Sequence, residues 1–154
     1  MMTSMNRRQL LQMLGLVCIP HVPIHLPRQV REDLLAVTEP RALPAMDWGD
    51  LVRTLESWGA WPWHRSTTTS HGDLGSMLMD FGHAVKWQQL ALRTAPATAI
   101  LVLRGNGAAF RPVEFAKVCS AIRNALDAST ELWLGAAHDQ ALVDALRVTL
   151  VMDG

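Results

Sequence analysis

The sequence lacks an excess of either charge, because its 14 Lys and Arg residues are matched by 14 Asp and Glu residues. Nucleic-acid binding needs a basic surface that displaces counterions from phosphates, so this balance argues against a nucleic-acid partner. A formal net charge of zero also leaves little electrostatic repulsion between copies of the chain, which favours self-association or a permanent protein partner. A chain of 154 residues can bury one core, so we expect one domain plus an N-terminal appendage.

Cysteine is scarce, and the residues that could hold a metal are scattered. Cys18 and Cys119 form no Cys-x-x-Cys or Cys/His cluster, so we expect neither a disulfide framework nor a zinc site. The glycine-rich phosphate loops of nucleotide-binding proteins are absent as well. Gly105-Asn106-Gly107 is too short to replace one and is interpreted as a turn. We therefore expect no metal and no cofactor bound to the chain alone.

The N-terminal segment, residues 1–27, has two interpretations. Its twin arginine, Arg7-Arg8, followed by a short apolar run over 13–19, resembles an export signal. That run is too short to span a bilayer, and no cleavage site follows it. The other interpretation is an amphipathic helix with apolar residues at i, i+3 and i+4 spacings. We expect a cytoplasmic protein without an integral membrane span, and export through the twin-arginine-like N-terminus is the alternative.

From residue 28 onward, hydrophobic spacing predicts helices alternating with strands. Residues 99–103 are apolar throughout, which is typical of a central strand covered on both faces. Residues 146–152 alternate apolar and polar, which predicts a strand with one polar face. The expected order is a helix ending before Pro40, a helix between Asp47 and Gly59, a strand over 60–69, a helix over 74–88 capped by Ser70, a strand over 99–103, a helix over 112–126, and strands over 132–134 and 146–152. This order implies an α/β two-layer sandwich whose four-stranded mixed sheet has helices packed on it.

Several motifs occur in this order and resemble one known domain. Residues 146–151 (LRVTLV) are similar to the strand L-R-V-T-V-V that ends the C-terminal domain of FtsZ, a cell-division protein of the tubulin superfamily. Residues 134–139 (LGAAHD) are similar to its I-G-x-x-x-D segment, and residues 100–107 (ILVLRGNG) to its V-L-V-N-I-T-x-G turn. Residues 37–40 (VTEP) resemble the I-T-R-P that closes its central helix. The resemblance covers residues 28–154, which we expect to form an FtsZ C-terminal-like domain.

Residues 47–52 (DWGDLV) carry the most informative resemblance, because they are similar to the D-F-A-D-V of the FtsZ synergy loop. That loop supplies aspartates to GTP bound by the next subunit of a filament. The resemblance therefore assigns Asp47 and Asp50 a catalytic role in trans, with GTP reached only through a partner subunit. The residues alone offer another interpretation, in which Asp47 caps a helix and Asp50 occupies its first turn.

Three parts of FtsZ have no counterpart in the sequence. The tubulin-type phosphate loop G-G-G-T-G-x-G is missing, so we expect the domain to stand alone without the GTP-binding domain. The asparagine that precedes the two aspartates in the synergy loop is replaced by the stretch Pro44-Ala45-Met46. Because the sequence ends at Gly154, we also expect no counterpart of the tail by which FtsZ holds its membrane tethers. We therefore expect no autonomous GTPase.

The combined expectation is an interaction module of cell division that docks on FtsZ, on an FtsZ-like protein or on a second copy. The expected docking face comprises Asp47, Trp48, Asp50, Trp61 and Trp63, since tryptophans cluster around the synergy-loop-like segment. The alternative is an exported or structural binding domain that retains only the FtsZ C-terminal fold.

Overall fold

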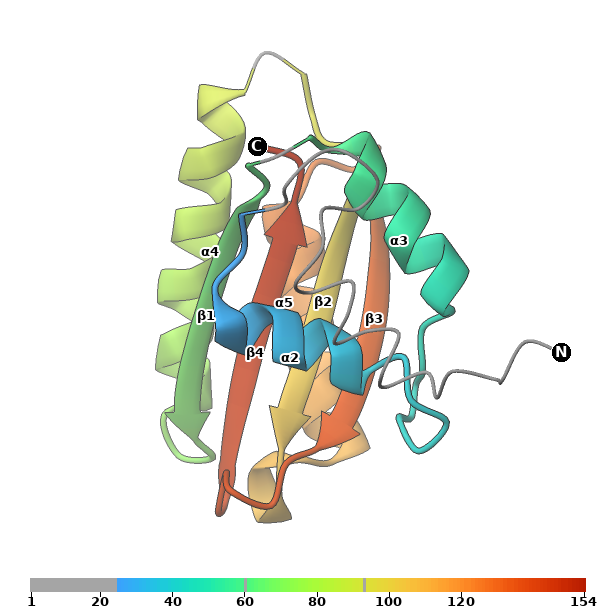
Figure 1. The fold of residues 1–154 in the computed structure, drawn as a ribbon. Coiled ribbons are helices and arrows are strands. Elements are labelled where there is room, and N and C mark those ends of the chain that lie inside the picture. The colour runs from blue at the N-terminus through green and yellow to red at the C-terminus, as the bar shows by residue number, and fades with distance from the viewer. Residues whose placement is uncertain (1–24, 60, 93) are drawn as a thin grey trace, which may run out of the picture.

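The computed structural model describes residues 25–59, 61–92 and 94–154 (Figure 1). The predictions for residues 1–24, including Cys18 and the twin arginine, lie outside the described residues. Along the chain the elements are α2 (Arg28–Ala36), α3 (Trp48–Ser57), β1 (Trp63–Ser70), α4 (Leu74–Ala91), β2 (Thr98–Gly105), the 3-10 helix η1 (Gly107–Ala109), α5 (Pro112–Ala125), β3 (Glu131–His138) and β4 (Ala145–Met152).

The four strands form one mixed sheet in the order β1-β4-β2-β3. β4 runs antiparallel to both of its neighbours, β1 and β2, whereas β2 and β3 are parallel. The parallel pair is joined by α5, because two parallel strands need a crossover connection. β2 and β4 are central and nearly all of their residues are buried, as the apolar run over 99–103 predicted for β2.

Helices cover both faces of the sheet (Figure 1). On one face, Phe81 and Val85 of α4 and Ile122 of α5 pack on Leu101 of β2 and Leu150 of β4. These two helices and the sheet form the helix-on-sheet packing expected from the sequence.

The shorter helices α2 and α3 cover the opposite face, where a second cluster contains Leu34, Leu51, Ile100, Val102 and Val151. Within the described residues, no helix combines the length and the apolar character needed to cross a bilayer.

The polar face predicted for β4 is not exposed to solvent. Arg147 and Thr149 point to the side of the sheet that carries α2, and both are buried. This polar face is the one that the sequence predicted, and it is buried because α2 lies across this part of the sheet and supplies a polar partner for the strand. An alternating pattern identifies the two faces of a strand, but it does not show whether the polar face meets water or another element.

Two local predictions have different outcomes. The segment 105–107 forms a turn, in which Gly107 has a positive φ of 73° and begins η1. Ser70, in contrast, does not cap the next helix. It is the last residue of β1, its Oγ donates to Asp73 Oδ2 at 3.0 Å, and α4 begins only at Leu74 after Asp73.

A buried carboxylate joins the turn before α4 to the first turn of α5. Glu114 is buried, its Oε1 lies 3.0 Å from His71 Nε2, and its Oε2 accepts from Lys117 Nζ at 3.4 Å. Burial raises the pKa of Glu114, but the hydrogen bonds from His71 and Lys117 outweigh it, and the net pKa lies below its ordinary value. The ionised form is therefore the one that stabilises this contact.

We predict that Glu114→Gln lowers the free energy of unfolding by about 1 kcal/mol at neutral pH. A carboxyl whose folded pKa lies below its unfolded pKa stabilises the protein above the unfolded value, and this contribution is lost as pH falls through the folded pKa. Urea unfolding from pH 3 to 8 should therefore show the two proteins converging at acid pH. Glu56→Gln, which removes an exposed carboxylate from α3, is the control, and an equally large loss there would contradict the prediction.

Candidate functional site

The segment between α2 and α3 is attached to the outer edge of β3. The Leu43 N–H donates to the Ala136 carbonyl at 2.8 Å, and the Ala136 N–H donates to the Pro44 carbonyl at 2.9 Å. The Met46 N–H then donates to the Val37 carbonyl at 2.8 Å, and the Met46 side chain is buried. These bonds hold the first turn of α3 beside β3.

Both predicted aspartates lie in the first turn of α3. Asp47 is the N-cap, and its Oδ2 accepts from the Asp50 N–H at 3.0 Å, as the capping interpretation predicted. Asp50 pairs with Arg53 one turn later at 2.5 Å. A Cβ at position 49 would lie 3.1 Å from Asp47 Oδ2, so Gly49 leaves room for the cap. Two exposed carboxylates therefore stand side by side, one bound to the backbone and one in a surface ion pair.

A shallow pocket of about 250 Å³ opens beside these carboxylates. Its lining comes from the start of α3, the segment before it and β3: Ala45, Met46, Asp47, Asp50, Trp133 and Leu134. We call this surface the α3–β3 face. It combines two acidic groups with the half-buried side chains of Trp133 and Leu134, so its chemistry suits a polar or cationic group held against an apolar floor.

The structure does not bring all the predicted docking residues together. Trp48 lies in the first turn of α3 beside the aspartates, but it is half-buried and packs on the cluster under α2 and α3. Trp61 and Trp63 follow the other end of this helix, whose 10 residues span about 15 Å. Trp63 packs on the cluster of the opposite face, whereas Trp61 is 72% exposed and stacks on His25 at 3.7 Å.

The tryptophan-rich segment therefore does not form one aromatic patch. Trp58, like Trp48, is half-buried against the cluster under α2 and α3. Of the four tryptophans at positions 48, 58, 61 and 63, only Trp61 is exposed. The other three side chains pack on the two cores, so the four tryptophans share no exposed surface.

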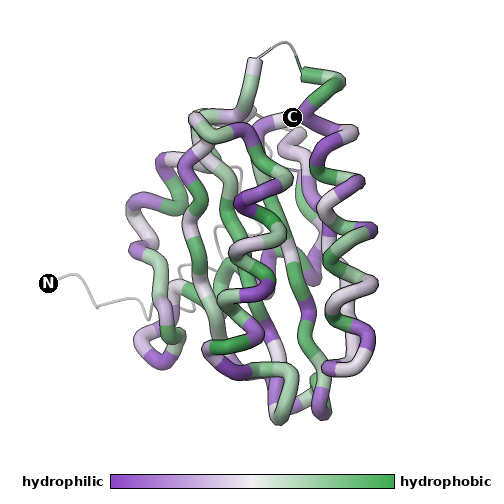
Figure 2. Tube along the Cα trace, turned by 180° about the vertical axis from the view of Figure 1, so that it is seen from behind, coloured by the Kyte–Doolittle hydropathy of each residue, from purple (hydrophilic) through white to green (hydrophobic). Residues whose placement is uncertain are grey.

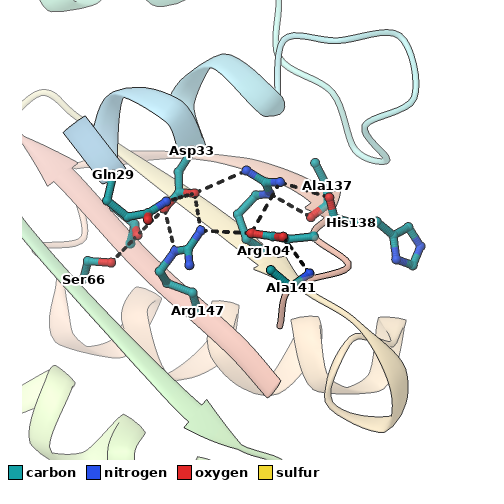
Figure 3. A network of polar contacts seen from close by, with 10 residues as sticks. Gln29, Asp33, Ser66, Arg104, Ala137, His138, Ala141 and Arg147 are labelled. Carbon is teal, nitrogen blue, oxygen red and sulfur yellow. Dashed lines mark hydrogen bonds and ion pairs between the residues drawn. The ribbon is translucent and has the colours of Figure 1, made fainter. Parts of the chain in front are cut away.

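Sequence reasoning missed the most connected polar group of the described structure, the carboxylate of Asp33 on α2 (Figure 3). Asp33 is fully buried, and its two oxygens accept from Arg147 Nε at 2.9 Å and Nη2 at 2.7 Å. Arg104 Nη1, Thr149 Oγ1 and Gln29 Nε2 also donate to it, at 3.3, 3.4 and 3.3 Å. The bidentate ion pair between Arg147 and Asp33 joins α2 to the centre of the sheet.

Asp139 completes the network at its outer end. Its Oδ2 accepts from Arg147 Nη2 at 3.4 Å and lies 3.8 Å from Arg104 Nη2. Arg104 also donates to the carbonyls of Ala137 and His138 at 3.2 and 3.0 Å. Two arginines and two aspartates thus neutralise one another. The hydrogen bond and charge of Asp33 raise the pKa of Arg147 against the effect of its burial, so Arg147 stays charged and holds α2 on the sheet.

The described residues show no group of three or more His, Cys, Asp or Glu side chains that could hold a metal ion. His64, His83 and His138 lie on β1, α4 and β3, and His71 lies in the turn before α4. Cys119 is a free thiol whose pKa is raised by burial, which keeps it protonated at neutral pH.

We predict that Asp33→Ala lowers the free energy of unfolding by about 3–5 kcal/mol, because it takes the buried carboxylate from Arg147 and Arg104 and leaves them only the more distant Asp139 as counter-charge. Urea unfolding followed by circular dichroism measures the loss. Glu32→Ala is the matched control on the same helix, where an exposed carboxylate pairs with Arg28, and it should change stability by less than about 0.5 kcal/mol. Similar losses in the two variants would contradict the structural role of Asp33.

A second prediction separates the cap of Asp47 from its charge. Asp47→Ala should cost about 1 kcal/mol, whereas Asp47→Ser should cost only a few tenths, because a serine hydroxyl can accept the same N–H. Thermal unfolding of the two variants measures the difference. Equal losses would show that the cap contributes nothing and that the charge alone matters.

Comparison with known proteins places this geometry in a known fold. No family model and no curated protein sequence matches the chain. FtsZ from M. jannaschii, solved as a point mutant, matches with a TM-score of 0.58 and 16% identity over 84% of this chain and 42% of the FtsZ chain. CetZ2 from Haloferax volcanii, solved as a GTPγS-bound protofilament, matches with a TM-score of 0.50 and 14% identity over 82% of this chain and 37% of that one.

This chain therefore spans less than half the length of the two solved proteins. The match covers their C-terminal domain fold and not their GTP-binding domain, so it gives no support to autonomous GTP hydrolysis. The expected mixed sheet of four strands with helices packed on it is confirmed. The described chain has the fold of the C-terminal domain of FtsZ.

Proposed function

We propose that this protein is an interaction module that docks on a subunit of FtsZ or of an FtsZ-like filament through the α3–β3 face. The observation that carries the proposal is the position of Asp47 and Asp50. Both carboxylates are exposed at the rim of the pocket beside β3, in the segment that resembles the synergy loop. In FtsZ that loop faces the nucleotide of the neighbouring subunit. The partner that we propose is therefore an FtsZ subunit whose nucleotide-binding side is not covered by another subunit.

The same face has the groups needed to act on GTP held by that partner. A carboxylate can orient an attacking water by accepting a hydrogen bond from it, and phosphoryl hydrolysis depends on such positioning. GTP would be reached only through the partner, whose own phosphate loop binds it. Docking is favoured over catalysis in trans, because the capping bond and the Arg53 pair already engage the two carboxylates and the synergy-loop asparagine has no counterpart.

The test uses the full chain and an FtsZ encoded in the same genome. Co-sedimentation with GTP-assembled filaments measures binding, phosphate release measures the GTPase rate, and electron microscopy measures filament length. We expect binding to FtsZ, with a change in GTPase rate and in filament length. Asp47→Ser with Asp50→Asn, which keeps the cap and removes both charges, should weaken binding about tenfold, as loss of interfacial charge pairs does.

The matched control removes two exposed carboxylates from the neighbouring surface by Glu32→Gln with Glu56→Gln and should bind like the unaltered protein. A loss of GTPase effect at saturating protein, with binding retained, would add a catalytic role for the aspartates. If the purified protein neither binds FtsZ nor alters its assembly, the docking function is wrong, and the alternative of an exported or structural binding domain takes its place.

A further inference from the structure

The outer edge of β1 carries backbone groups that no described residue satisfies. The N–H of Asn106, the residue after β2, donates to the Ala145 carbonyl at 3.2 Å, so the first residue of β4 directs its carbonyl toward β2. Backbone groups alternate sides along a strand, so the even-numbered residues of β4 face β1 and pair there with the odd-numbered residues of β1. The residues between them, His64, Ser66 and Thr68, therefore direct their N–H and C=O groups away from the sheet.

Within the part of the chain that the structure describes, β1 is the open edge of the sheet. The opposite edge, on β3, is bonded at Ala136 to Leu43 and Pro44, whereas no described residue forms a backbone hydrogen bond with the outward groups of β1. The strand also lacks the usual protection of an edge, since it contains no proline and no lysine. Its single formal charge, on Arg65, lies over the Phe81 ring, 5.7 Å from the centroid. An edge of this kind is a template for a further strand.

The position of α4 decides what kind of strand fits this edge. Figures 1 and 2, seen from opposite sides, both show α4 running along β1. Paired strands lie about 4.8 Å apart. Two copies of the chain joined through β1 would bring their α4 helices to a similar separation, whereas packed helices need about 8–10 Å between their axes. A second copy therefore does not fit, and the occupant of fitting shape is an extended segment that carries no helix behind it.

The N-terminal segment joins the described chain beside this edge. The His25 ring stacks on the Trp61 ring with their centroids 3.7 Å apart, and Trp61 lies two residues before β1 begins. Residues 13–19 (MLGLVCI) are an apolar run of strand length without proline or formal charge. Residues 20–24 connect this run to His25, and an extended chain of that length covers about 17 Å. The run can therefore reach the open edge of β1.

We propose that residues 13–19 add to the open edge of β1 as a fifth strand of the sheet. The run ends toward His25, which lies beside the start of β1, so the added strand is antiparallel to β1. Proline has no N–H to donate, so the pairing ends before Pro20, with Cys18 or Ile19 opposite His64. The seven residues of the run are enough to pair with all three outward residues of β1. An amphipathic helix over the same segment would leave these backbone groups to water.

Amide hydrogen exchange of the full chain, followed residue by residue by NMR, tests the added strand. The N–H groups of His64, Ser66 and Thr68 should exchange at least about tenfold more slowly in the unaltered chain than in Val17→Pro, which interrupts the strand. The odd-numbered residues of β1 stay bonded to β4 and should keep their protection in both chains. Gln9→Pro, outside the run, is the matched control and should leave the three N–H groups slow. Fast exchange at all three in the unaltered chain overturns the proposal, as does slow exchange that Val17→Pro leaves unchanged or that is lost on dilution.

Disulfide formation from Cys18 tests the position of the added strand, in a background with Cys119→Ser. A disulfide needs Cα atoms within about 7 Å. Under mild oxidation, Cys18 should therefore pair with the thiol introduced by His64→Cys or by Arg65→Cys, since one of these positions lies opposite it. Glu131→Cys is the matched control, because it begins β3 at the other edge of the sheet. Mass spectrometry of the monomer measures the yield. No disulfide at position 64 or 65, or an equal yield at position 131, overturns the fifth strand.

Discussion

The ion pair between Asp33 and Arg147 is the contact on which the position of α2, and through it the candidate site, depends. Both side chains are buried, so neither charge can be left without the other. Replacing a buried ion pair by apolar residues often leaves the free energy of unfolding unchanged. The pair between Asp33 and Arg147 therefore contributes mainly by specifying one position of α2 on the sheet. A shift of β4 by one residue would turn Arg147 into the apolar core under α4 and α5. The ion pair therefore disfavours any register of β4 other than the observed one.

The arrangement set by Asp33 extends along the chain to Asp47. Beyond Asp33, Val37 lies so close to β3 that a Cβ on Gly135 would approach its Cβ to 2.6 Å. Glycine at this position therefore allows the end of α2 to contact the strand. The next residue, Ala136, lies at the outer edge of the sheet and forms backbone hydrogen bonds with Leu43 and Pro44. The Met46 N–H donates a further backbone hydrogen bond to the Val37 carbonyl. The first turn of α3 is thus held by backbone contacts, while its two carboxylates remain exposed.

Sequence reasoning located the elements because each has a local signature. The apolar run of β2, the proline at the start of α5 and the capping spacing of Asp47 and Asp50 can all be recognised without knowledge of the fold. Asp33 and Arg104 could not be found in this way. Their partners lie 114 and 33 residues away, and an aspartate in an amphipathic helix has no local sign of burial. Asp139 and Arg147 lie within the two segments that resemble FtsZ, residues 134–139 and 146–151, but the resemblance predicted no role for them, and their common partner on α2 lies outside both motifs.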